Sequence, residues 1–169
     1  MKIHKDTPLS EILKIGKQCT RKNNCCKYGS GFLIGDDIKR IAKFLGITEE
    51  ELKNNYLEEA ELFNTRLFRP KIRRVKNRPY GPCVFFDGTG CTIHKVKPLQ
   101  CRVGTCGKYG EEVSIWFMLN YLVNRDDPES IRQYALYLKN GGKTIEGGKL
   151  EDLVPNKERL RKILSMEIL

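Results

Sequence analysis

Seven cysteines in two groups constrain this chain more than any other feature of its sequence. One group lies near the start, and the other follows a long stretch without cysteine. Thiolates are soft ligands that suit zinc, copper(I) and iron–sulphur clusters. We therefore expect a metal centre that joins two distant parts of one fold. The candidate ligands are Cys19, Cys25, Cys26, Cys83, Cys91, Cys101 and, on thinner grounds, Cys106.

The composition places the chain among globular proteins. It has 169 residues, of which 40% are hydrophobic, which is enough for one domain with its own core. No apolar run approaches the roughly 20 residues of a membrane span, and residues 1–8 contain no apolar secretory core. We expect a cytoplasmic location without a membrane partner. Clustered thiols there indicate metal or redox chemistry rather than disulfides, and the odd cysteine count agrees.

Apolar periodicity and capping signals predict a mainly α fold with little β. The expected form is a small, irregular, metal-centred single domain over residues 1–169, with large cysteine-bearing loops. Its cysteine-cluster region covers residues 19–106, and a helical C-terminal part covers residues 107–169. The spacing predicts helices over residues 8–17, 36–45, 48–63, 111–123, 127–139 and 156–166, an irregular loop over 19–35, and a short buried strand over 83–86.

Charge is segregated in the middle of the chain, whose formal net charge is +10. Six glutamates between residues 49 and 61 precede seven bases that have no acid among them. These bases favour docking on the acidic face of a partner protein in a hetero-complex; nucleic acid is the less favoured partner. A solvated edge strand and pairing with the chain's own acidic segment are the alternatives, and together they are favoured over nucleic acid. The bases are Arg66, Arg69, Lys71, Arg73, Arg74, Lys76 and Arg78.

The cysteine spacing does not identify the metal. No CxxC pair occurs, so the zinc-ribbon pattern is absent, and the ferredoxin run is absent too. Cys25 and Cys26 are adjacent, and their side chains need an unusual bend to reach one ion. Seven sulphurs exceed the four ligands of one zinc site. We therefore favour one or two iron–sulphur clusters as the cofactor, with zinc as the alternative.

The order of these motifs resembles the YkgJ-like cysteine-cluster family, described as a zinc- or iron-chelating domain. Its opening pattern is CxxCxxCC, followed by an Asp-Ile helix start. It continues with a central Cys-Pro-Phe-Leu-like piece, then Cys-x-Ile-Tyr and Arg-Pro-x-x-Cys-Arg. The matching pieces here are Cys19, Cys25 and Cys26; Asp37-Ile38; Cys83-Val84-Phe85-Phe86; Cys91-Thr92-Ile93-His94; and Lys97-Pro98-Leu99-Gln100-Cys101-Arg102. The resemblance covers about residues 19–106.

Three departures from that pattern affect the site. Lys22 stands where the family has its second cysteine. His94 takes the tyrosine position, which favours packing or hydrogen bonding over ligation. Lys97 replaces arginine, so a point charge replaces a planar fork of donors. Cys106 lies outside the pattern.

Three functions are compatible with these residues. The preferred one is a metal-binding accessory protein that holds an iron–sulphur cluster and serves electron relay, cluster transfer or maturation within a larger assembly. The first alternative is a zinc-stabilised nucleic-acid-binding module, which the net charge supports. The second is a protein-lysine methylase-like enzyme, because flagellin lysine methylases resemble this family in their cysteine region. No catalytic residue pair accompanies the cysteines, so the sequence favours a protein that is not an enzyme.

Overall fold

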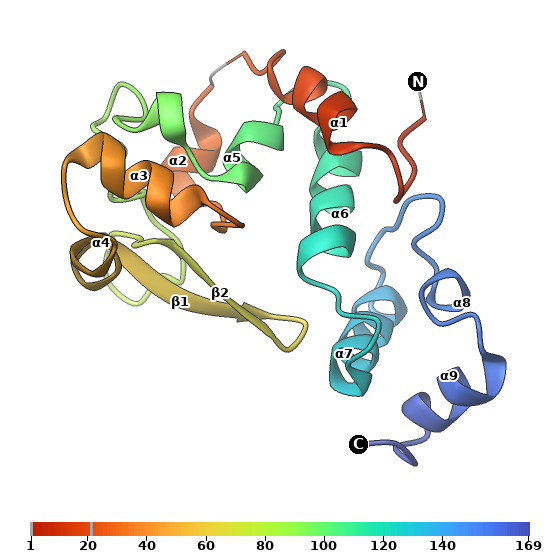
Figure 1. Cartoon of the computed structure of the whole chain (residues 1–169). Helices are drawn as coiled ribbons and strands as arrows, with labels where there is room; N and C mark the ends of the chain where they lie inside the picture. The colour runs from red at the N-terminus through yellow and green to blue at the C-terminus, as the bar shows by residue number, and fades with distance from the viewer. Residues whose placement is uncertain (1, 21) are drawn as a thin grey trace.

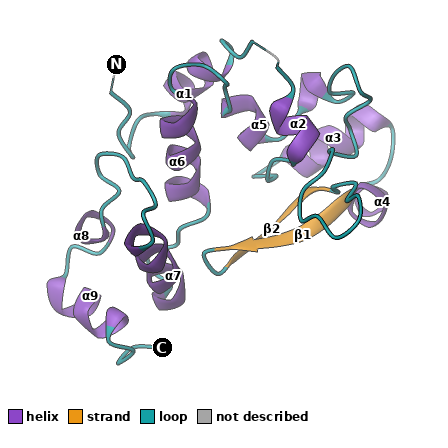
Figure 2. Cartoon of the chain, turned by 180° about the vertical axis from the view of Figure 1, so that it is seen from behind, coloured by secondary structure: helices purple, strands orange, loops and turns teal. Residues whose placement is uncertain are grey.

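The computed structural model describes residues 2–20 and 22–169. Within them the fold is mainly helical, as predicted, with a two-stranded antiparallel sheet (Figures 1 and 2). No helix in these residues combines the length and the apolarity that a membrane crossing requires. The elements are α1 (Leu9–Gly16), α2 (Asn24–Tyr28), α3 (Asp37–Leu45), α4 (Glu49–Tyr56), β1 (Leu57–Leu62), β2 (Thr65–Pro70), the 3-10 helix η1 (His94–Val96), α5 (Leu99–Val103), α6 (Gly110–Tyr121), α7 (Pro128–Lys139), α8 (Leu150–Leu153) and α9 (Lys157–Leu164).

Helices with a clear capping signal begin where the sequence predicts. Thr48 and Glu51 form a reciprocal capping box at the start of α4. Asp127 caps α7 in front of Pro128, and Asn156 caps α9. The prediction for α1 is one residue off, because Pro8 is the N-cap and the Thr7 hydroxyl instead accepts a hydrogen bond from His4 N.

The helix predicted over residues 48–63 is wrong in its second half. α4 ends at Tyr56, and the glutamates that follow belong to strand β1. β1 pairs with β2 in a register that places Glu58 opposite Arg69 and Glu61 opposite Arg66. Opposite charges facing each other across two strands stabilise the pairing. This tertiary pairing overrides the helix propensity of the glutamates.

Three further expectations require correction. Residues 83–86 form no strand; they are fixed by the isolated bridges Ile72–Cys83 and Phe86–Cys91. The loop expected over residues 19–35 contains the short helix α2. Phe44, whose spacing from Ile38 and Ile41 in the sequence predicts that all three face inward from α3, is 45% exposed.

The hydrophobic core has two parts, and the buried residues of α5, Leu99 and Val103, belong to the larger one. One lies under α3 and α4 and includes Leu52, Phe85 and Ile93. The larger one is built around α6 and α7 and takes in α1 from the start of the chain. Figure 1 shows α6 between the cysteine-bearing lobe, which comprises α2 to α5, and the C-terminal helices α7 to α9. Phe63, at the tip of the β1–β2 hairpin, packs against Tyr134 of α7 and so connects the hairpin to the larger part of the core.

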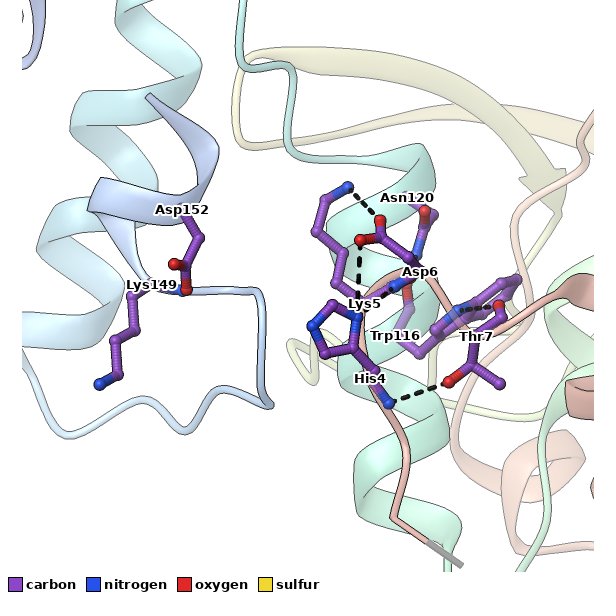
Figure 3. A network of polar contacts seen from close by, with 8 residues as sticks. All are labelled: His4, Lys5, Asp6, Thr7, Trp116, Asn120, Lys149 and Asp152. Atoms are coloured by element: carbon purple, nitrogen blue, oxygen red, sulfur yellow. Dashed lines mark hydrogen bonds and ion pairs between the residues drawn. The ribbon is translucent and has the colours of Figure 1, made fainter. Parts of the chain in front are cut away.

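The N-terminal arm is fixed to residues more than a hundred positions away (Figure 3). The indole of Trp116 donates to Thr7 O, and the amide of Asn120 donates to Lys5 O, both at 2.9 Å. His4 forms a parallel bridge with Glu146. These contacts hold α1 in place, and the end of α1 borders the cysteine-bearing lobe.

Candidate metal centre

All seven cysteines line a single cavity of about 490 Å³. The early and the late group therefore meet, although a long cysteine-free stretch separates them. Much of the remaining wall is apolar and includes Phe85, Ile93 and Phe117. A cavity walled by thiols and apolar groups offers soft ligands in surroundings with little water.

Backbone contacts hold the two cysteine groups together. Cys25 and Cys26 lie on α2, and the amide of Cys83 donates to Cys26 O at 2.8 Å. Cys91 is fixed by its bridge to Phe86, which closes the turn that begins at Asp87. The turn is stabilised by the Asp87 carboxylate, which accepts from two backbone amides that follow it. The sulphur atoms of the adjacent Cys25 and Cys26 lie 3.9 Å apart at the cavity wall, a proximity that sequence adjacency alone does not predict.

Asp37 fixes α5, the helix that carries Cys101. Its side chain is fully buried and accepts hydrogen bonds from the backbone amide of Leu99 at 2.7 Å and from that of Ile34 at 2.9 Å. It also pairs with Arg40 at 2.7 Å and with Arg102 at 3.2 Å. The start of α3 and the Cys-Arg piece of α5 are thus joined by one carboxylate.

Gly31 gives Cys101 room at the cavity wall. A Cβ atom built at Gly31 would lie 2.5 Å from Cys101 Sγ and 3.2 Å from its backbone nitrogen. No side chain therefore fits at this position without displacing the sulphur. Gly29, two residues earlier, has no such neighbour, since its nearest contact would be the carbonyl of Cys25 at 4.0 Å.

Two of the thiols are readily ionised. A hydrogen bond from the Cys26 thiol lowers the pKa of Cys25 to about 6, and the charge of Lys97 lowers it further. The same two partners lower the pKa of Cys91 to about 7. The pKa of Cys26 is raised because its proton serves both neighbours. Thiolates, not thiols, bind metals, so Cys25 and Cys91 carry the charge that receives a cation at neutral pH.

Three other thiols, those of Cys83, Cys101 and Cys106, have pKa values shifted upward. Burial raises the pKa of Cys83 to about 11 and that of Cys101 to about 12, and charge on Cys25 and Cys91 adds to both. Burial also raises the pKa of Cys106, and the next largest influence on it is Cys19. The cysteines thus form an inner set and an outer pair, the pair being Cys19 and Cys106.

The donor set fits both a zinc ion and an iron–sulphur cluster. Sulphurs around one tetrahedral zinc lie about 3.8 Å apart, because each Zn–S bond is about 2.3 Å long, and the sulphurs of Cys25 and Cys26 lie 3.9 Å apart. Within residues 2–20 and 22–169, no three His, Cys, Asp or Glu side chains gather closely enough to form a finished metal site. The seven thiols surround a cavity of about 490 Å³, which has room for one ion or for several metal and sulphide atoms.

Two residues singled out from the sequence line the cavity without being cysteines. The positive charge of Lys97 stabilises the Cys25 thiolate. The sequence shows only that lysine replaces arginine there, and does not reveal this role. His94 lies at the wall, hydrogen-bonded through its backbone to Cys91 at 3.1 Å. The role of Asp37 is the one that the sequence analysis missed, whereas glycines at residues 29 and 31 are what a close backbone approach to a metal requires. The sequence offered one signal for the role of Asp37: the family pattern contains both the Asp-Ile motif at Asp37 and the Cys-Arg motif at Cys101.

Most of the basic side chains between residues 66 and 78 form ion pairs or hydrogen bonds within the molecule. Arg69 and Arg74 both pair with Glu58, at 2.9 and 3.0 Å, and Arg66 pairs with Glu61 at 3.1 Å. Arg74 and Arg69 lower the pKa of Glu58. Lys71 donates to Asn54 O at 2.8 Å, and Arg73 donates to the carbonyls of Cys83 and Phe86. Lys76 and Arg78 remain exposed, and Arg78 lies 5.9 Å from the ring centre of Tyr80.

A family comparison now identifies the class of this cysteine arrangement. The model of the CxxCxxCC family, "Putative zinc- or iron-chelating domain", matches residues 18–115. The chain belongs to this family. The matched residues include all seven cysteines, the Asp37 contact and α5. A search of curated proteins and a search of solved structures found no match. Family membership supports metal binding and leaves zinc and iron as the two candidates.

Proposed function

We propose that this CxxCxxCC chain is an accessory protein that holds an iron–sulphur cluster in the cysteine cavity. It would serve a larger assembly in electron relay, cluster transfer or enzyme maturation. The observation that carries the proposal is one cavity of about 490 Å³ lined by seven thiols, which is more than the four ligands of one zinc site. Irregular spacing and adjacent cysteines suit several metal atoms better than one.

The chain's own residues prepare the site in three ways. Cys25 and Cys91 provide thiolates at neutral pH, while the inner thiols lose their protons on metal binding. Lys97 offsets part of the negative charge that gathers there. The apolar wall, with Phe85 and Phe117, restricts water. An iron–sulphur cluster supplies one-electron chemistry when bound, with a potential set by such charges and by solvent access.

The proposed partner surface lies at the rim of the cavity. Tyr28 lines the cavity, is 62% exposed, and makes an edge contact with Tyr80 at 6.3 Å. Arg78 stacks on Tyr80, and Val75 nearby in the chain is 61% exposed. Aromatic and arginine side chains are enriched where proteins bind each other. Because the exposed charges here are positive, the proposed partner presents an acidic face.

The deciding experiment is metal analysis of protein purified without oxygen. We expect a coloured protein with iron and labile sulphide in similar amounts. Cys83→Ser should lose both, whereas Cys106→Ser, a substitution in the outer pair, should keep them. Colourless protein with one zinc per chain and no sulphide would instead support the zinc-stabilised module. Methyl transfer to a protein lysine, abolished by Cys25→Ser, would support the methylase-like enzyme.

The partner is tested by changing the rim alone. Lys76→Ala with Arg78→Ala should reduce recovery of an acidic partner from the native cell, and the loss should be reproduced by added salt in the wild type. Lys39→Ala with Lys43→Ala on α3 is the control of equal charge. Recovery of nucleic acid with both variants would contradict the proposed partner.

A further inference from the structure

A second cavity, of about 550 Å³, adjoins the cysteine cavity. It lies between the end of α1 and α5 and shares Cys19, His94 and Lys97 with its neighbour. Four cationic side chains line it, and no carboxylate does among the described residues. The four cations are Lys14, Lys17, Lys97 and Arg102.

A tight backbone contact holds this group of charges in place. A Cβ atom at Gly16 would lie 2.0 Å from the carbonyl oxygen of Arg102, so α1 packs on α5 with no side chain between them. This contact brings Lys14 and Lys17, which are at the end of α1, to the same hollow as Lys97. In the described part of the chain, none of these three lysines forms an ion pair. Arg102 is paired with Asp37 and Lys97 faces the thiolates, so Lys14 and Lys17 add positive charge that no carboxylate among the described residues neutralises.

Arg102 leaves a donor unused at this place. Its Nη2 pairs with Asp37, but its Nε is buried and has no hydrogen-bond partner in the described residues. Asp37 is already shared with Arg40 and with two backbone amides. A buried donor without a partner lowers stability unless something else accepts its hydrogen bond. That nitrogen is closed to solvent and therefore to a ligand, so a ligand in the cavity would contact the rest of the Arg102 side chain, which is 32% exposed.

From this arrangement we infer that the second cavity is a binding site for a small molecule with a multiply charged oxyanion, a phosphate or a group of carboxylates. Lysine and arginine side chains bind such oxygens through charge-assisted hydrogen bonds. The bounded hollow favours a small ligand over a long polyanion, which would need an extended basic stripe. The ligand would lie directly beside the cysteine cavity, since the two share a wall. This site does not depend on which metal the thiols hold.

The test is calorimetric titration of the full anaerobically purified protein with pyrophosphate and, separately, with citrate. Chloride is used to keep the ionic strength constant. We expect saturable binding of at least one of the two anions, and which one binds identifies the oxyanion. Lys14→Gln with Lys17→Gln should weaken it at least tenfold, and Lys14→Arg with Lys17→Arg should restore it. All four residues in these variants and the control are exposed, so the fold should be retained.

The control is Lys39→Gln with Lys43→Gln, which removes the same charge from α3, away from the cavity. It should change the affinity less than twofold, and the metal content should be equal in both variants. Equal weakening in both variants would overturn the inference, because it would show dependence on net charge alone. Absence of saturable binding by either anion would overturn it too, as would tighter binding of a single-stranded oligonucleotide at the same residues. A protein that binds anions but lacks iron would leave this site standing while contradicting the proposed function.

Discussion

Gly31→Ala offers the sharpest test of whether Cys101 is a metal ligand. The substitution adds one methyl group at a position where the Cβ would lie 2.5 Å from Cys101 Sγ. Carbon and sulphur in contact stay at least about 3.5 Å apart, so the sulphur or the backbone has to move by about 1 Å. Metal–sulphur distances hold within about 0.2 Å. The shift therefore exceeds what a ligand position tolerates.

The expected result combines stability and metal content. Overpacking of this kind costs about 1–3 kcal/mol in the free energy of unfolding, which urea titration of the metal-free protein measures. Metal retention under a chelator should fall at least tenfold relative to the wild type. Gly29→Ala is the matched control: Gly29 has an extended backbone, and its added Cβ would have no neighbour closer than 4.0 Å. Wild-type metal retention in Gly31→Ala would refute the assignment of Cys101 as a ligand.

Three further predictions concern the surroundings of the site. Alkylation of Cys25 in the metal-free protein should be half-maximal near pH 6, because its pKa is lowered to about 6. Cys106, whose pKa is raised above 9.0, should react only at higher pH. Identical pH profiles for the two cysteines in peptide mapping would contradict this prediction. Asp37→Ala should lower the free energy of unfolding by about 3 kcal/mol, since it leaves Arg102 without its carboxylate, and a loss below about 1 kcal/mol in urea would show that the contact is dispensable. Thr48→Ala should cost about 1 kcal/mol by removing the cap of α4, with Thr48→Ser as the variant that retains it.

Local signals in the sequence predict the helices well. The starts of α4, α7 and α9 follow from residues that bond to nearby amides, so a few consecutive positions carry the information. Strand β1 is different, because its glutamates favour a helix when considered alone. Only the arginines of β2, which follow in the chain and face them across the hairpin, decide the outcome.

The candidate site shows the same difference between features set by nearby residues and features set by distant contacts. The motif order predicts that both cysteine groups meet, because a shared metal explains why they occur together. The role of Asp37 was missed because it depends on contacts with α5, about 65 positions further along the chain. The basic segment shows the opposite case: its charge was visible, but its pairing with Glu58 and Glu61 required the register of the hairpin.

The N-terminal arm has a consequence for the order of assembly. Lys5 and Thr7 precede every cysteine in the chain, whereas their partners Asn120 and Trp116 follow all seven. On the ribosome, the thiols are therefore complete before the arm can close against α6. In that interval α1 lacks the contacts that hold it in place in the folded protein.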